Sequence, residues 1–167
     1  ELGTALAAAA QGAGLVLSAQ ASVAMEDVAR IVLSEAQRGP LWFQLYLQRD
    51  RGFDGELVRR AEAAGFEALV LTVDAPAHGA RDRERRAGFR LPAGISAVNL
   101  AGAPRVRTGG ELCGGLLAAA PGWDDVAWLR ALTTLPLLLK GVLPPGDARL
   151  AQQHGVDALI VSSHGGR

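Results

Sequence analysis

The sequence contains few of the residues that build disulfide frameworks or bind polyanions. Its 167 residues include one cysteine, Cys113, which excludes an internal disulfide and a cysteine-based zinc site. The 17 basic residues balance the 17 acidic ones, and aromatic residues make up 5% of the chain, so a nucleic-acid partner is not expected. No apolar run reaches the roughly 18 residues of a membrane span, so no membrane segment is expected either.

Both ends of the chain read as interrupted elements. The only methionine is Met25, and residues 2–13 form an alanine-rich helical pattern with no capping residue before it. At the other end, a strand pattern enters the loop 162–167 without the helix that normally follows. We therefore expect an interior segment of a longer protein. No secretory segment is visible, which favours a cytoplasmic location.

Strand and helix patterns alternate along the chain. Strands are predicted at 15–17, 41–47, 68–73, 135–139 and 158–161, and helices at 2–13, 25–36, 53–64, 124–132 and 146–154. The strands begin 23 to 27 residues apart, except for one interval of 67 residues. Apolar strands that alternate with helices indicate an α/β protein with a parallel sheet. Two architectures fit: an open doubly wound sheet without a G-x-G-x-x-G loop, or an arc of a (β/α)8 barrel.

Polar side chains follow or end all five predicted strands. They are Ser18, Gln44, Tyr46, Thr72, Asp74, Lys140, Ser162 and His164. The carboxyl ends of parallel strands lie at one edge of a sheet, so these side chains are expected to meet there. In a barrel this is where active sites are built. The alternative is that polar residues are simply common at strand ends, and five strands in a row argue against it.

These strand ends belong to longer motifs that run in order along nearly the whole chain. They are Trp-Phe-Gln-Leu-Tyr at 42–46, Leu-Thr-Val-Asp-Ala-Pro at 71–76, Phe-Arg-Leu-Pro at 89–92, Leu-Lys-Gly at 139–141 and Val-Ser-Ser-His-Gly-Gly-Arg at 161–167. Together they resemble the FMN-dependent α-hydroxy-acid oxidases and dehydrogenases, the family of glycolate oxidase, mandelate dehydrogenase and flavocytochrome b2. The resemblance implies a TIM barrel of which this chain holds strands two to six of eight. Residues 1–167 would then be one incomplete domain, with an irregular loop at about 93–122.

The resemblance also implies roles in binding and oxidising the substrate. His164 would be the base that takes a proton from the substrate as its α-carbon is oxidised. Asp74 would orient His164 and stabilise its charged form. Arg81 and Arg167 would bind the substrate carboxylate through their guanidinium groups, and Tyr46 would hydrogen-bond the substrate.

The cofactor implied by the resemblance is FMN, with no metal. Lys140 would lie against the N1–O2 edge of the flavin, where a cation stabilises the negative charge of the reduced ring. Ser18, Gln44 and Thr72 would bind the polar edge of the ring, with Ser162 as a further candidate.

The expected activity is oxidation of a small 2-hydroxy acid to a 2-oxo acid, with electrons passed to oxygen or another acceptor. Family members are often tetramers, so association into a homo-oligomer is possible. Two alternatives stay open. The chain is a truncated, non-catalytic fragment that does not retain FMN, or it belongs to another (β/α)8 enzyme that binds a phosphorylated ligand.

Overall fold

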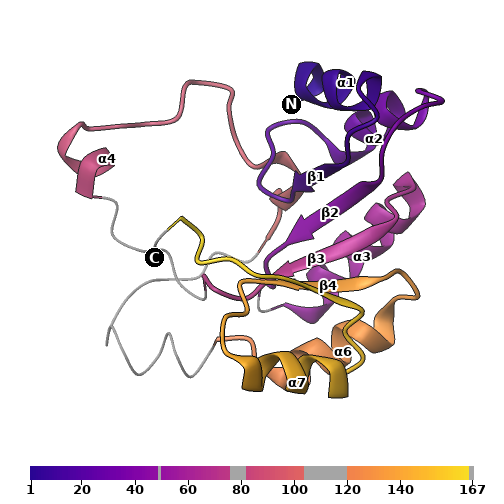
Figure 1. The fold of residues 1–167 in the computed structure, drawn as a ribbon. Coiled ribbons are helices and arrows are strands. Elements are labelled where there is room, and N and C mark those ends of the chain that lie inside the picture. The colour runs from indigo at the N-terminus through magenta and orange to yellow at the C-terminus, as the bar shows by residue number, and fades with distance from the viewer. Residues whose placement is uncertain (49, 76–81, 104–119, 166–167) are drawn as a thin grey trace.

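The computed structural model describes residues 1–48, 50–75, 82–103 and 120–165 (Figure 1). One parallel sheet contains the strands β1 (Leu15–Ser18), β2 (Leu41–Leu45), β3 (Ala68–Thr72), β4 (Leu137–Lys140) and β5 (Ala158–Ile160). The helices are α1 (Leu2–Ala10), α2 (Met25–Leu33), α3 (Arg51–Ala64), α4 (Asp82–Arg86), α6 (Trp123–Leu132) and α7 (Pro145–Gln153), with a 3-10 turn η1 (Val98–Leu100). No helix of the described segments is long and apolar enough to cross a bilayer.

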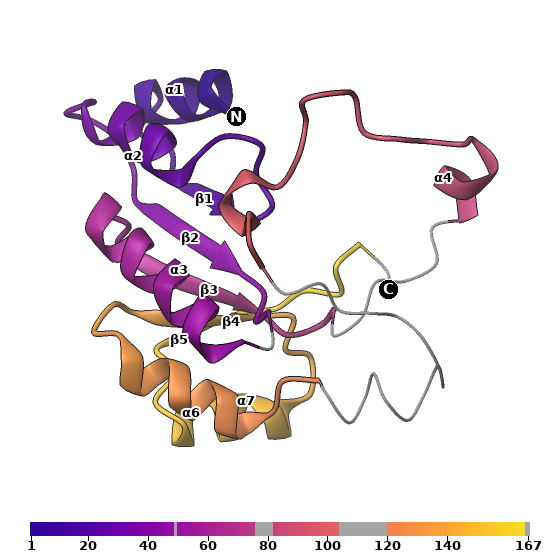
Figure 2. The same cartoon turned by 180° about the vertical axis from the view of Figure 1, so that it is seen from behind.

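The order of the strands decides between the two architectures. In the sheet the order is β1-β2-β3-β4-β5, the same as in the chain, and every pair of neighbours is parallel. A doubly wound sheet reverses its order at a switch point, and these five strands show no reversal. The strands all point to the same side of the molecule (Figure 2). The sheet is therefore an arc of a (β/α)8 barrel, as the sequence predicted.

The two faces of the sheet are built differently. One face packs against the helices and forms the main core, which includes Phe43, Leu45, Leu69, Leu71, Leu137 and Leu139 from the strands and Val28, Val32, Leu57, Val58 and Leu129 from the helices. The opposite face carries a smaller apolar cluster around Val70 and Leu138, against which Trp42 packs. Side chains alternate between faces along a strand, so two residues further on this second face presents Gln44, Thr72 and Lys140. The inner face thus changes from apolar to polar toward the carboxyl ends.

Local chemistry explains where the elements begin and end. The Asp50 side chain accepts a hydrogen bond from the Phe53 amide at 3.0 Å, so α3 begins at Arg51 rather than at the predicted Phe53. Gly65, with φ +90°, ends the same helix in the left-handed conformation. The fourth strand begins at Leu137 rather than at 135. Pro136 has no amide hydrogen to donate, although its carbonyl accepts from the Leu69 amide at 2.9 Å.

The other boundaries differ by a few residues. The first helix ends at Ala10, three residues before the predicted end, and Gly12 follows with φ +66°. The second helix ends at Leu33 and not at 36. The second strand ends at Leu45, which leaves Tyr46 in the loop that leads to α3. Within the predicted irregular loop at 93–122, the turn η1 is an ordered element, because the buried Asn99 side chain accepts from the Met25 amide at 2.9 Å.

Candidate active site

A row of hydrogen-bonded side chains crosses the carboxyl ends of the first three strands. The Ser18 hydroxyl donates to Gln44 Oε1 at 2.9 Å, and Gln44 Nε2 donates to Thr72 Oγ1 at 2.9 Å. Gln44 and Thr72 are buried, with 8% and 6% of their surface exposed. Thr72 Oγ1 accepts from Gln44, so its own hydrogen is left to donate to a ligand. The row presents a fixed set of polar groups to the barrel interior.

Lys140 continues this row onto the fourth strand. It is the last residue of β4 and lies opposite Thr72 in the register of β3 and β4. Its side chain is half-buried, and among the described residues no carboxylate forms an ion pair with it. A cation in a partly dry site is costly without a counter-charge. The position therefore suits a ligand that is or becomes negatively charged.

Asp74 and His164 form a hydrogen-bonded pair beyond the ends of β3 and β5. His164 Nδ1 lies 2.8 Å from Asp74 Oδ1, and the side chains are 31% and 13% exposed, respectively. A carboxylate only accepts, so Nδ1 carries the hydrogen of this contact, and in the neutral ring Nε2 is then the nitrogen with the lone pair. His164 itself has φ +53°, and its amide donates to Ser162 Oγ at 3.0 Å. The histidine is thus held both by its backbone and by its ring.

Gly141 makes room for the Asp74 carboxylate. The sheet ladder continues past the strands, where the Val73 amide donates to the Lys140 carbonyl and the Gly141 amide donates to the Ile160 carbonyl. This pairing brings Gly141 against Asp74, and a Cβ on Gly141 would lie 2.5 Å from both Cβ and Cγ of Asp74. The sequence reasoning missed Gly141. The signal was available, because this glycine directly follows a strand that ends in a site residue.

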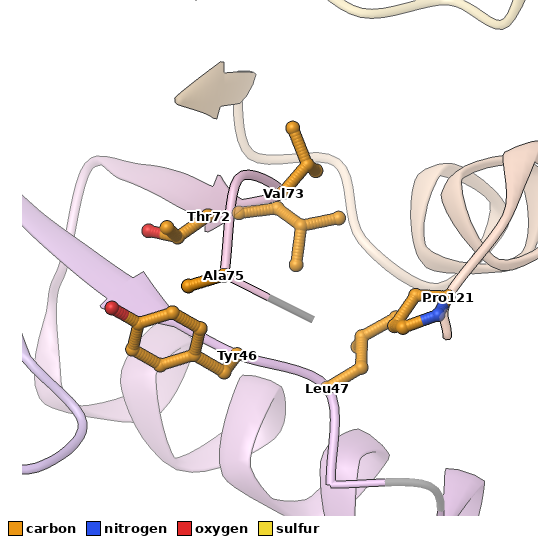
Figure 3. Close-up of a pocket in the computed structure, with 7 residues that line it drawn as sticks. Tyr46, Leu47, Thr72, Val73, Ala75 and Pro121 are labelled. Atoms are coloured by element: carbon orange, nitrogen blue, oxygen red, sulfur yellow. The ribbon is translucent and has the colours of Figure 1, made fainter. Parts of the chain in front are cut away.

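Tyr46 lies next to the polar row. It lines a small pocket at the ends of β2 and β3, together with Leu47, Leu71, Thr72, Val73, Ala75 and Pro121. Figure 3 shows the hydroxyl groups of Tyr46 and Thr72 on the same side of this pocket, away from Leu47 and Pro121. Tyr46 is therefore placed where its hydroxyl group and Thr72, a member of the polar row, border one space.

Eight of the ten predicted site residues lie within the described segments. Ser18, Gln44, Thr72 and Lys140 form the row, Asp74 pairs with His164, and Ser162 contacts the His164 backbone. Arg81 and Arg167 lie outside the described residues. The specific role of each residue stays a prediction. Within the described segments, no group of three or more His, Cys, Asp or Glu residues is arranged to hold a metal ion.

Comparison with known proteins addresses the resemblance directly. The chain is 45% identical over its whole length to an L-lactate oxidase from Nostoc sp. and 41% identical to a glycolate oxidase from Spinacia oleracea, covering 48% and 46% of those proteins. A crystal structure of mandelate oxidase with 3,3-difluoro-2-hydroxy-3-phenylpropionic acid superposes with a TM-score of 0.81 at 40% identity, over 99% of this chain and 43% of that one. The chain thus spans about half the length of the relatives it matches.

The family model extends the match to every residue of the chain. The model described as FMN-dependent dehydrogenase matches residues 1–167, which include the polar row, the Asp74–His164 pair and both predicted arginines. The fold, the order of the motifs and the sequence identity agree, and on these grounds the chain is a member of the FMN-dependent dehydrogenase family.

Proposed function

We propose that this chain forms the central part of an FMN-dependent enzyme that oxidises a small 2-hydroxy acid to the 2-oxo acid and passes the electrons to oxygen. The observation that carries the proposal is the Asp74–His164 pair at 2.8 Å, placed beside the polar row that ends in Lys140. Relatives named L-lactate oxidase and glycolate oxidase support both the hydroxy-acid substrate and oxygen as the acceptor.

The residues present fit a flavin ring. The Thr72 hydroxyl has a hydrogen to donate, Gln44 holds that hydroxyl in place, and Lys140 supplies a positive charge that no described carboxylate neutralises. These groups match the hydrogen-bond acceptors of the flavin's pyrimidine edge and the negative charge that this edge gains. FMN, when bound, would supply the two-electron acceptor that no amino-acid side chain provides.

His164 would act as the base of the reaction. Nδ1 donates to Asp74, so Nε2 is the nitrogen that takes a proton from the substrate. The ring becomes positively charged in that step, and the Asp74 carboxylate stabilises the charge. The substrate gives up two hydrogens in all, as two protons and two electrons, and oxygen takes them up as hydrogen peroxide. The Tyr46 hydroxyl, Arg81 and Arg167 would hold the substrate during this step.

A second candidate function follows from the open edges of the sheet. Within the described residues, β1 pairs only with β2, and β5 pairs only with β4. A barrel arc with two open edges has less support for a bound flavin than a closed barrel. The alternative is therefore a non-catalytic fragment that keeps the site residues without retaining FMN. A cytoplasmic location and association into homo-oligomers stay predictions from the sequence.

Stopped-flow reduction of bound flavin tests the proposal. In the full-length protein that contains this chain, mixing with L-lactate or glycolate without oxygen should bleach the flavin absorption. His164→Ala should slow the bleaching about 100- to 10,000-fold, because a general base is lost, while flavin stays bound. His154→Ala serves as the matched control. His154 stacks on Trp123 between α6 and α7, so it should leave the rate unchanged. The proposal would be contradicted if no 2-hydroxy acid bleached the flavin, or if His164→Ala bleached at the wild-type rate.

A further inference from the structure

One buried carboxylate lies outside the site just described. Asp54 is 2% exposed, although it lies in the first turns of α3, where the neighbouring Arg51 and Glu56 are exposed. Burial raises the pKa of Asp54 to about 6, the Gln48 amide opposes this shift, and the carboxylates of Asp50 and Asp125 add to it. Keeping a carboxyl group in such a place lowers stability unless its hydrogen bonds compensate.

The hydrogen bonds of Asp54 lead out of its own helix. The N-terminus of α3 is capped by Asp50, so Asp54 is not needed for that task. Instead, both of its carboxyl oxygens accept from the backbone amide of Gln48, at 2.9 and 3.0 Å. Asp54 thus anchors the loop between β2 and α3 at Gln48, a residue outside regular secondary structure.

Gln48 passes this constraint on to Tyr46. Its side-chain Nε2 donates to the Tyr46 carbonyl at 2.8 Å. Tyr46 is the first residue after β2, where the chain turns into the loop that leads to α3. The two contacts of Gln48, one through its amide and one through its side chain, connect Asp54 to the backbone of Tyr46. That ring lines the pocket beside Thr72 (Figure 3).

We propose that Asp54 is a positioning residue, which acts through Gln48 to hold the Tyr46 hydroxyl in the geometry that binds the substrate. This inference rests on the proposed function, in which Tyr46 contacts the 2-hydroxy acid. Asp54 itself touches neither substrate nor flavin. Removing the Asp54 carboxyl group should therefore lower substrate oxidation only to the extent that the Tyr46 hydroxyl contributes to it.

A double-mutant cycle separates this role from a general effect on folding. In the full-length flavin-loaded protein, Asp54→Val should lower kcat/KM for the 2-hydroxy acid about 10-fold, as expected for a displaced hydrogen bond. In the Tyr46→Phe background the same change should have almost no effect, because the hydroxyl is already absent. Asp54→Asn should largely restore kcat/KM, since the amide oxygen still accepts from Gln48.

Two further variants keep the test decisive. Gln48→Ala removes the contact to the Tyr46 carbonyl without touching the buried site, and its loss of kcat/KM should likewise disappear in Tyr46→Phe. Glu56→Gln removes an exposed charge from the same helix, where Glu56 pairs with Arg59, and should change nothing. Hydrogen exchange of the Gln48 amide provides a readout apart from activity. It should accelerate in Asp54→Val and stay slow in Asp54→Asn.

The outcomes distinguish the inference from the proposed function. An equal loss in both backgrounds would show that Asp54 acts through general stability and would overturn the inference. No loss in Asp54→Val and Gln48→Ala, or no effect of Tyr46→Phe, would overturn it as well. In each of these cases the wild-type protein still oxidises the 2-hydroxy acid, so the proposed function stands. If the wild-type protein oxidises no 2-hydroxy acid, both the proposed function and the inference about Asp54 are overturned.

Discussion

The functional arrangement at the scale of single residues depends on small side chains as much as on reactive ones. Asp74 and His164 can pair because the neighbouring Gly141 has no Cβ. The φ of Gly141, +107°, is also a backbone conformation that glycine adopts far more readily than other residues. Any larger residue at this position would push against the Asp74 carboxylate. The geometry of the proposed base is therefore controlled by a residue that carries no functional group.

Gly141→Ala should disconnect this pair. We expect the added methyl group to displace the Asp74 carboxylate and to slow substrate oxidation on the order of 100-fold, the cost of a misplacement of about 1 Å. Flavin absorption should be retained. The measurement is the rate of anaerobic flavin reduction in the full-length protein.

Gly88→Ala is the control for backbone strain alone. Gly88 also has a positive φ, +60°, but no atom lies within 4 Å of the added Cβ. It should cost some stability and leave the rate unchanged. If both variants kept the wild-type rate, Gly141 would have no part in placing Asp74.

Helix α3 shows how one element joins stability to the site. Its cap, Asp50, and its left-handed end, Gly65, are visible in the sequence, and they set the length of the helix. Its inward face packs Leu57 and Val58 into the core, and on the same helix Asp54 is buried and reaches the loop of Tyr46. The amphipathic pattern predicted the helix but not this use of a carboxylate, because the partner of Asp54 is a backbone amide.

The raised pKa of Asp54 predicts how stability changes with pH. The folded carboxyl keeps its proton up to about pH 6, whereas the unfolded chain releases it near 3.8. The folded state therefore binds the proton more tightly, and this contribution to stability is lost as pH rises from about 4 to about 6. Two pKa units correspond to roughly 3 kcal/mol.

Thermal unfolding of the wild type and of Asp54→Asn across this window measures the effect. The variant cannot titrate, so its melting temperature should rise relative to that of the wild type as pH increases from about 4 to about 6. A constant difference between the two proteins over the whole window would show that Asp54 has an ordinary pKa in the folded protein.

The described part of the molecule, taken as a whole, is an arc with two open edges. Val16 on β1 and Val161 just after β5 are 47% and 76% exposed, which is high for valines in or beside a barrel strand. The chain also spans about half the length of its relatives. The polar row and the Asp74–His164 pair both lie within the arc.

The 167-residue chain by itself should bind FMN weakly or not at all. Titration of the purified chain with FMN, followed by flavin fluorescence, should show no saturation at concentrations that load the full-length protein. The physical reason is that an unclosed arc would cover less of the ring than a closed barrel does. Saturable binding, with bleaching on addition of a 2-hydroxy acid, would contradict this expectation and would indicate a site completed by association of copies.

The amino-acid sequence alone was enough to predict the alternation of strands and helices, the shared edge at which the polar residues meet, and the family. Each of these depends on periodicity or on short motifs, which are local properties of a chain. The residues of the polar row, Gln44 and Thr72 among them, could be named because each lies at or beside the carboxyl end of an apolar strand.

The periodicity of the sequence left an open sheet and a barrel arc both possible, and the three-dimensional fold distinguished them, because strand order depends on which strands pair. The fold also revealed the contacts of Gly141 and Asp54. Their partners, Asp74 in one case and the Gln48 amide in the other, are brought close by the sheet ladder and by the packing of α3. Contacts of that kind depend on space and burial, which no local pattern in a sequence records.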